Sequence, residues 1–132
     1  MGNADAQHYL GLMYDNGEGV PEDDAKAVSW YRKAAEQGHA TAQHNLALMY
    51  AKGEGVPEDD AKAAHWYRKA AEQGYARAQL NLGLMYDNGE GVPKDDVKAV
   101  SWYHKAAEQG HKWAQYNLGL MYANGEGIPE DD

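Results

Sequence analysis

A 36-residue unit, His39–Gly74, recurs on both sides of itself and limits the possible folds more than any other feature of this sequence. Full copies occupy 3–38, 39–74 and 75–110, and 111–132 begins a further copy that stops partway. Repeats of this length are typical of solenoids, in which each unit packs only on its neighbours and forms an extended surface. We therefore predict one repeat domain spanning 1–132, with about three and a half repeats.

Each copy contains two amphipathic patterns separated by turn residues. Apolar residues recur at helical spacing from Ala6 to Tyr14, which predicts a helix over about 4–15, called helix A. Gly17 can end this helix in the left-handed conformation, and Asp23 with Asp24 can cap a second helix that runs to about Gln37, called helix B. The remaining copies repeat the pattern, with helix A over about 40–51, 76–87 and 112–123, and helix B over about 60–73 and 96–109.

The connections between these helices are short, so consecutive helices should run antiparallel. Stacked pairs with a small constant rotation give a superhelix. The expected fold class is all-α: a right-handed α-solenoid of antiparallel helix pairs, seven helices in all. Helix A should line the inner wall and helix B the outer wall.

The composition excludes several classes of partner. The 132 residues carry a formal net charge of -9, and much of the acid lies in clusters such as Glu22–Asp24 at the start of helix B. There the carboxylates match the positive end of the helix dipole, which explains them better than a metal or polycation site. An acidic chain without a basic stripe is a poor binder of phosphate backbones, so we predict no nucleic-acid partner.

The chain contains no cysteine, so neither disulfides nor thiolate chemistry is expected. No apolar run is long enough for a signal peptide or a membrane span, so we expect a soluble chain without membrane insertion. Asp132 ends the chain where a helix should begin, as in a fragment of a longer protein. The compartment stays open between the bacterial cytoplasm and a secreted or periplasmic location.

A set of small, aromatic and glycine residues recurs at fixed spacing in every copy. In the first copy these are Ala6, Leu10, Gly11, Tyr14, Gly17, Gly19, Val20, Ala27, Trp30, Tyr31, Ala34, Ala35 and Gly38. With them the chain resembles the Sel-one-like repeat family, a relative of the tetratricopeptide repeat. The one departure is Ala47, where the other copies carry glycine, and its extra methyl group should be accommodated locally.

The resemblance implies an adaptor fold that binds proteins without a cofactor. A cysteine-rich branch of the family has been associated with β-lactam binding. The absence of cysteine here argues against membership of that branch.

Positions that differ between copies are not required by the shared packing, and on helix A they fall on one face, turned away from the core. In the tetratricopeptide pattern this face lines the groove. We therefore predict a peptide groove formed by His8, Tyr9, Leu12, Thr41, His44, Asn45, Leu48, Arg77, Leu80, Asn81, Leu84, Trp113, Tyr116, Asn117 and Leu120.

Three parts of this groove have a second interpretation. The amides of Asn45, Asn81 and Asn117 could bond the backbone of a bound peptide, or they could bond the backbone of the next repeat. The leucines at the position of Leu12 could form an apolar groove floor, or adjacent A helices could cover them. Trp113 and Tyr116 could anchor a partner, or they could cover an open end of the array.

Metal and catalytic chemistry find little support. The chain has six histidines, but they lack the spacing of a zinc site, and no cysteine or carboxylate completes a four-ligand set. The run Asp15–Gly19 lacks the alternating oxygen ligands of a calcium loop. No Ser/His/Asp set or phosphate-binding glycine loop is present in the sequence. We predict no metal, no cofactor and no enzymatic activity.

The leading functional prediction is a non-enzymatic scaffold that binds a protein or peptide in the concave groove lined by the A helices. The alternative is a purely structural or engineered consensus array without a specific ligand. A hydrolase or a β-lactam-binding relative ranks third. Both ends carry helix faces without a neighbouring repeat, near Leu10 and Leu118, so weak head-to-tail self-association is also predicted.

Overall fold

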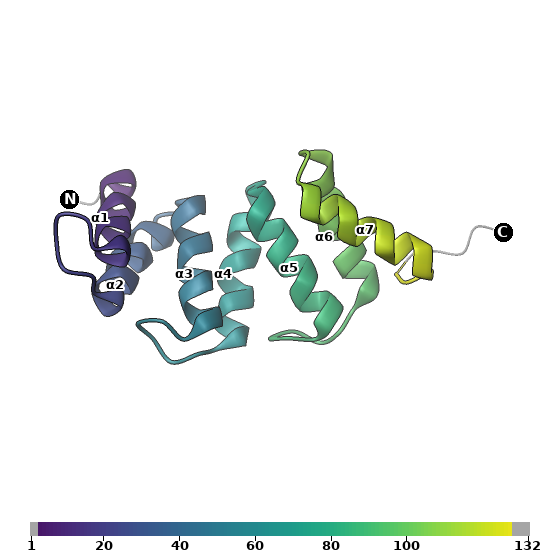
Figure 1. Cartoon of the computed structure of the whole chain (residues 1–132), viewed down its shortest axis with the longest axis horizontal. Coiled ribbons are helices and arrows are strands. Elements are labelled where there is room, and N and C mark those ends of the chain that lie inside the picture. Colours follow the sequence, from purple (N-terminus) through teal and green to yellow (C-terminus); the bar gives the residue numbers. More distant parts are fainter. Residues whose placement is uncertain (1–2, 128–132) are drawn as a thin grey trace.

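The computed structural model describes residues 3–127, which form seven helices and no strand (Figure 1). The helices are α1 (Ala4–Asn16), α2 (Asp24–Glu36), α3 (Ala40–Lys52), α4 (Asp60–Glu72), α5 (Ala76–Asn88), α6 (Asp96–Glu108) and α7 (Lys112–Asn124). They follow one another along the long axis of an elongated molecule, with α1 and α7 at opposite ends. The predicted all-helical repeat solenoid is confirmed, with α1, α3, α5 and α7 as the A helices.

The helix ends follow the predicted capping chemistry. Asp23 precedes α2 and its side chain accepts a hydrogen bond from the backbone N–H of Lys26 at 3.1 Å. Gly17 ends α1 in the left-handed conformation, with φ of 69°. One cap was not predicted: His39 precedes α3, and its Nδ1 accepts a hydrogen bond from the N–H of Ala42 at 3.1 Å.

The core is built from alanine, leucine, methionine and tyrosine, and small residues let the paired helices approach closely. A Cβ on Gly11 would lie 2.5 Å from Cδ1 of Tyr31, so the tyrosine of α2 packs directly on the α1 backbone. The second copy has Ala47 at this position, fully buried against α4. Since Ala47 carries the Cβ for which Tyr31 leaves no room, the ring of Tyr67 must pack differently from that of Tyr31.

Glutamine side chains join consecutive repeats inside the core. Gln43 is buried, and its Nε2 donates a hydrogen bond to the carbonyl of Ala35 in the preceding repeat at 3.1 Å. Nε2 of Gln73 then donates to Oε1 of Gln43 at 2.8 Å and to the carbonyl of Gly38 at 3.0 Å. The same bonds recur one repeat later, so these amides join the end of one repeat to the next by hydrogen bonds at each inner junction.

Candidate functional site

The residues predicted to line the groove all lie on the A helices, but their exposure differs widely. We call the contact between the first and second copies the first junction. The second junction joins the second and third copies, and the third junction joins the third copy to the partial fourth copy. His44 is only 1% exposed, and its ring packs at the second junction between Tyr67 of its own repeat and Tyr75 of the next, with centroid distances of 5.6 and 5.0 Å. This corrects the prediction for His44, whose side chain lies inside a junction and not on an open groove.

His8 occupies the same position in the first copy. Its ring stacks on His39 of the next repeat, at a centroid distance of 4.8 Å, and it is half-buried. Burial and the nearby His39 lower the pKa of His8. In the third copy Leu80 takes this position and packs against the core. The residue at this position therefore contributes to the contact between repeats.

The asparagines use a partner that neither sequence interpretation included. Nδ2 of Asn45 lies 2.9 Å from Nε2 of His8, and Nδ2 of Asn81 lies 3.2 Å from Nε2 of His44. Each amide thus bonds an imidazole of the preceding repeat, instead of a backbone group of the next. Asn117 faces the position of Leu80 one repeat earlier, where no imidazole is available.

The remaining groove residues stay accessible to solvent. Leu12, Leu48 and Leu84 are half-buried, each packed partly against the core, whereas Leu120 is 45% exposed. Thr41 is half-buried, and Tyr9 and Arg77 are exposed. Trp113 and Tyr116 are 66% and 59% exposed and contact each other edge to face. The face formed by these residues, called the A-helix face, is therefore partly open along the array.

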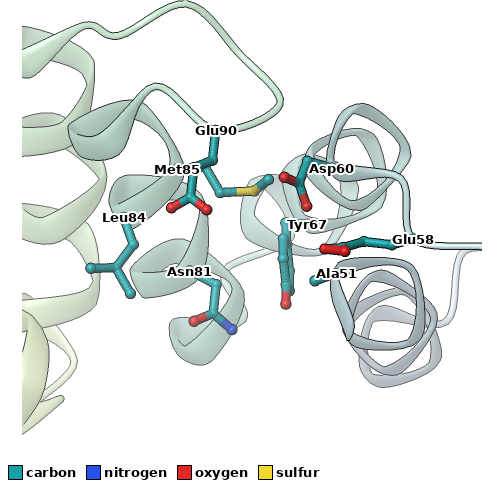
Figure 2. A pocket seen from close by; sticks show the side chains of 8 residues that line it. All are labelled: Ala51, Glu58, Asp60, Tyr67, Asn81, Leu84, Met85 and Glu90. Atoms are coloured by element: carbon teal, nitrogen blue, oxygen red, sulfur yellow. The ribbon is translucent and has the colours of Figure 1, made fainter. Parts of the chain in front are cut away.

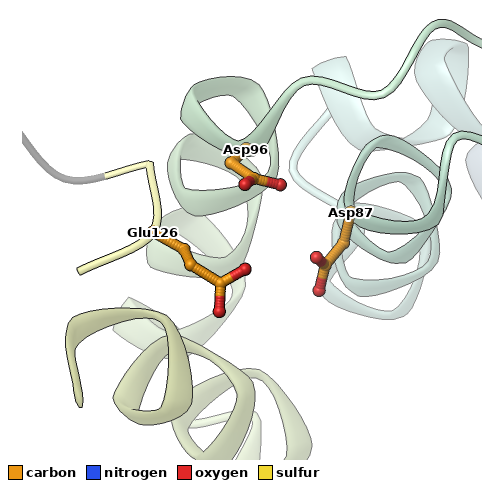
Figure 3. Close-up of side chains that lie close together, drawn as sticks. All are labelled: Asp87, Asp96 and Glu126. Carbon is orange, nitrogen blue, oxygen red and sulfur yellow. The ribbon is translucent and has the colours of Figure 1, made fainter. Parts of the chain in front are cut away.

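Three carboxylates that are distant in sequence meet at the third junction. Oxygens of Asp87, Asp96 and Glu126 lie within 4.8 Å of one another (Figure 3). Nζ of Lys94 already neutralises part of this charge, because it lies 2.7 Å from Oδ1 of Asp96 and 2.9 Å from the carbonyl of Asp87. The hydrogen bond to Asp96 raises the pKa of Lys94. The proximity of these residues was not predicted from the sequence, although each belongs to a recurring position.

The equivalent place at the second junction is a pocket of about 220 Å³, between α3 and α4 on one side and α5 on the other (Figure 2). Its lining residues are Ala51, Glu58, Asp60, Tyr67, Asn81, Leu84, Met85 and Glu90. Glu90 lines the same pocket as Asp60 because the neighbouring Gly91, with φ of 71°, packs directly on the carbonyl oxygen of Asp60. Of these eight residues, only Asn81 and Leu84 were predicted as site residues.

Ala51 explains why space is left at this junction. In the first copy the hydroxyl of Tyr31 donates a hydrogen bond to Asp15 at 2.8 Å, and in the third copy Tyr103 donates to Asp87 at 3.0 Å. The second copy has Ala51 in place of the aspartate. Within residues 3–127 no side chain or backbone group bonds the hydroxyl of Tyr67, and burial raises the pKa of Tyr67 to about 12.

This difference predicts unequal effects of removing the tyrosine hydroxyls. Tyr103→Phe should lower the free energy of unfolding by about 1–2 kcal/mol, because it removes a hydrogen bond to a partly buried carboxylate. Tyr67→Phe should change it by less than about 0.5 kcal/mol, because no such bond is lost. Urea denaturation of the two variants checks this. Equal losses would mean that the hydroxyl of Tyr67 is bonded as firmly as that of Tyr103.

None of the helices within residues 3–127 combines the length and the apolar character that crossing a membrane requires.

The Sel1 repeat family model matches the chain over residues 4–39, 40–75, 76–111 and 114–132. No curated protein sequence matches it. Two solved structures are similar over almost the whole chain. One is the protective antigen c5321 of uropathogenic Escherichia coli, which displays an SLR fold, with 50% identity, 95% coverage of this chain and a TM-score of 0.93. The other is a Sel1 repeat protein from Oxalobacter formigenes, with 44% identity, 98% coverage and a TM-score of 0.94.

A third solved structure is less similar. It is the cysteine-rich protein B of Helicobacter pylori, with 26% identity, 86% coverage of this chain, 92% coverage of that protein and a TM-score of 0.72. The chain spans only 27% of the length of the E. coli antigen and 53% of the length of the O. formigenes protein.

Proposed function

Because the chain belongs to the Sel1 repeat family, we propose that it is a non-enzymatic scaffold that binds an extended protein segment along its A-helix face. Proteins of this family are generally protein-interaction scaffolds. The observation that carries the proposal is the partly open A-helix face, where Leu84 and Leu120 lie on successive A helices and Trp113 and Tyr116 are exposed on α7. The A-helix face offers a partly accessible leucine in each repeat and exposed aromatic residues at both ends. An extended segment can place one side chain against each of these positions.

The burial pattern supports a smaller set of partner-binding residues than the predicted groove. Leu48, Leu84 and Leu120 are available for apolar contacts, and Oδ1 of Asn81 can still accept a hydrogen bond while Nδ2 bonds His44. His44 acts indirectly, because it holds Asn81 from within the junction. The binding surface proposed here is therefore narrower than the groove predicted from sequence.

Selection from a random peptide library displayed on phage tests the proposal. Selected peptides should bind at least about tenfold more weakly to the double variant Leu84→Ala/Leu120→Ala, because anchor contacts at the centre of an interface carry most of the binding energy. The matched control is Val97→Ala, which removes an exposed apolar side chain on α6 and restores the alanine of the other two copies. Peptides that lose affinity only for the Val97 variant would contradict the proposal.

Self-association is a separate proposal about the ends of the array. On α7 the side chains of Tyr116, Leu120 and Tyr122 are exposed, and the equivalent side chains of the inner copies are more deeply buried. A second copy could cover this face with its own α1, giving a weak head-to-tail contact. Sedimentation over a wide concentration range should show an average mass that rises with concentration, and Leu120→Glu should abolish the rise.

A further inference from the structure

We propose that the pocket at the second junction binds the ammonium group of a lysine side chain from the protein partner. This inference rests on the proposed function in one respect: the lysine belongs to the protein that binds along the A-helix face. The pocket offers negative charge, one unpartnered hydroxyl and an apolar wall. Its repeat equivalent at the third junction already holds a lysine ammonium of the chain itself.

The charge in the pocket is negative and unpaired. Glu58, Asp60 and Glu90 contribute carboxylates, and Figure 2 shows them around the ring of Tyr67. Ion pairs within residues 3–127 join His39 to Asp5, Lys94 to Asp96 and His104 to Glu108, so none of them neutralises this pocket. Arg77, on α5 one turn before Asn81, is close enough to oppose the rise in the pKa of Tyr67, but it does not line the pocket.

Besides the three carboxylates, the hydroxyl of Tyr67 is a second feature of the pocket that points to a ligand. Its side chain is 4% exposed and lines the pocket, yet its hydroxyl is the one that lacks the aspartate partner found in the other two complete copies. Within residues 3–127 the buried side-chain atom without a partner is Nδ1 of His44, so the hydroxyl of Tyr67 is accessible from the pocket, where water or a ligand can bond it. The hydroxyl oxygen can accept a hydrogen bond from an ammonium group.

The third junction shows what kind of group fits this place. There Nζ of Lys94 lies 2.7 Å from Oδ1 of Asp96, and Asp96 corresponds to Asp60 in the repeat. Lys94 itself corresponds to Glu58. At the second junction Asp60 is therefore the carboxylate that could bind an ammonium group, and Glu58 stands in place of the lysine. An ammonium from outside the chain can take the vacated position.

The rest of the lining suits the lysine stem. Leu84 and Met85 provide apolar contacts for methylene groups, and Oδ1 of Asn81 offers a further acceptor. An acidic side chain would meet three carboxylates, and an uncharged apolar side chain would leave them unpaired. The pocket opens beside Leu84 of the A-helix face, so a partner lying along that face can insert one lysine here.

n-Butylammonium is a minimal probe because it carries the ammonium and the four-carbon stem of lysine. In protein labelled with ¹³C at the methionine methyl groups, it should shift the Met85 signal saturably, with a Kd on the order of millimolar. The Met49 signal, from the same position in the preceding copy, should not move. n-Butanol and butyrate should leave both signals unchanged. An equal Met85 shift with n-butanol, or none with n-butylammonium, would overturn the proposal.

Two variants test the residues. Glu58→Lys recreates the Lys94 arrangement and should weaken n-butylammonium binding at least about tenfold, whereas Glu22→Lys makes the same charge change at the first junction and should alter it less than about twofold. Tyr67→Phe, which keeps the charge, should weaken binding about threefold or more. Melting temperatures confirm that each variant is folded. Equal losses for Glu58→Lys and Glu22→Lys would show nonspecific attraction to an acidic protein and contradict the site.

The remaining outcomes separate this inference from the proposed function. Tighter binding of n-butylguanidinium than of n-butylammonium would overturn the assignment to lysine. Failure of the probe, while selected peptides still need Leu84 and Leu120, would remove the lysine pocket and leave the scaffold function intact. Binding of the probe without any peptide binding would support the pocket and remove the proposed function.

Discussion

Replacing Gly91 with alanine should lower the free energy of unfolding by about 3 kcal/mol, which is among the largest effects expected of a single methyl group in this chain. Two causes add. The φ of 71° places Gly91 in the left-handed region, which costs a residue with a Cβ about 1–2 kcal/mol. The new Cβ would also overlap the carbonyl of Asp60 and lie 3.0 Å from Cε of Met85. The backbone of one repeat would then have to move away from the next.

Gly74→Ala is the matched control, because it separates the two causes. Gly74 has a φ of 94°, but a Cβ there would have no atom within 4 Å, so only the backbone term of about 1–2 kcal/mol should appear. Urea denaturation of both variants measures the difference. An equal loss at the two positions would mean that the contact between Gly91 and Asp60 does not contribute to the stability of the stack.

The helices and most of their caps could be predicted from the sequence, because they depend on residues that are close in the chain. Apolar spacing within helix A, the aspartate before helix B and the glycine after helix A all act over a few residues. Comparing the copies with one another made the pattern stronger, because each copy repeats the same local signals.

The contacts between repeats were harder to predict. In every complete copy a glycine stands at the position of Gly19, in the turn between helix A and helix B, yet Gly91, its equivalent, is also required by close approach to the preceding repeat. A turn signal does not reveal which backbone lies beside it. In the same way, the second copy carries Ala51 where the other two complete copies carry aspartate, but the loss of the aspartate matters only because Tyr67 lies opposite it. Comparing the copies could not have revealed these contacts, because Gly91, Asp60 and Tyr67 have the same residue type at their positions in every complete copy.

The predicted groove residues also show that contacts between repeats are hard to predict from sequence. Variation between copies was taken to mean freedom from packing, and for Trp113 and Arg77 the structure places the side chains in solvent. For His44 the variation has another cause, because histidine and leucine both fill the space between two repeats. A position can therefore vary and still be buried, provided that its neighbours accept both side chains.

Acid should destabilise the protein between about pH 6.5 and pH 4, and His44 should account for a large part of the loss. Burial and the charge of Arg77 lower the pKa of His44 to about 4. Nε2 of His44 lies 3.2 Å from Nδ2 of Asn81, and the buried Nδ1 has no partner within residues 3–127. A proton on Nε2 would face the amide N–H group of Asn81, which is a donor.

Proton linkage gives the direction in which the free energy of unfolding changes with pH. In the unfolded chain His44 has the ordinary histidine pKa of 6.5, so below that pH the unfolded state binds a proton that the folded state does not. The stability contributed by the neutral ring is complete above pH 6.5 and is lost as the pH falls through the folded pKa. A difference of this size corresponds to about 3 kcal/mol. His8 adds to the loss in the same direction, because its pKa is also lowered.

His44→Leu removes the titrating group and restores the residue that the third copy carries as Leu80. The variant should lose about 2–3 kcal/mol less than the parent chain when urea denaturation at pH 7 is compared with pH 4.5, because leucine fills the junction without accepting a proton. The control is His65→Ser, which replaces a solvent-exposed histidine on α4 with the serine of the other two copies. If the control reduced the acid loss as much as His44→Leu does, burial of His44 would not be the cause, and exposed histidines would have to explain the acid sensitivity.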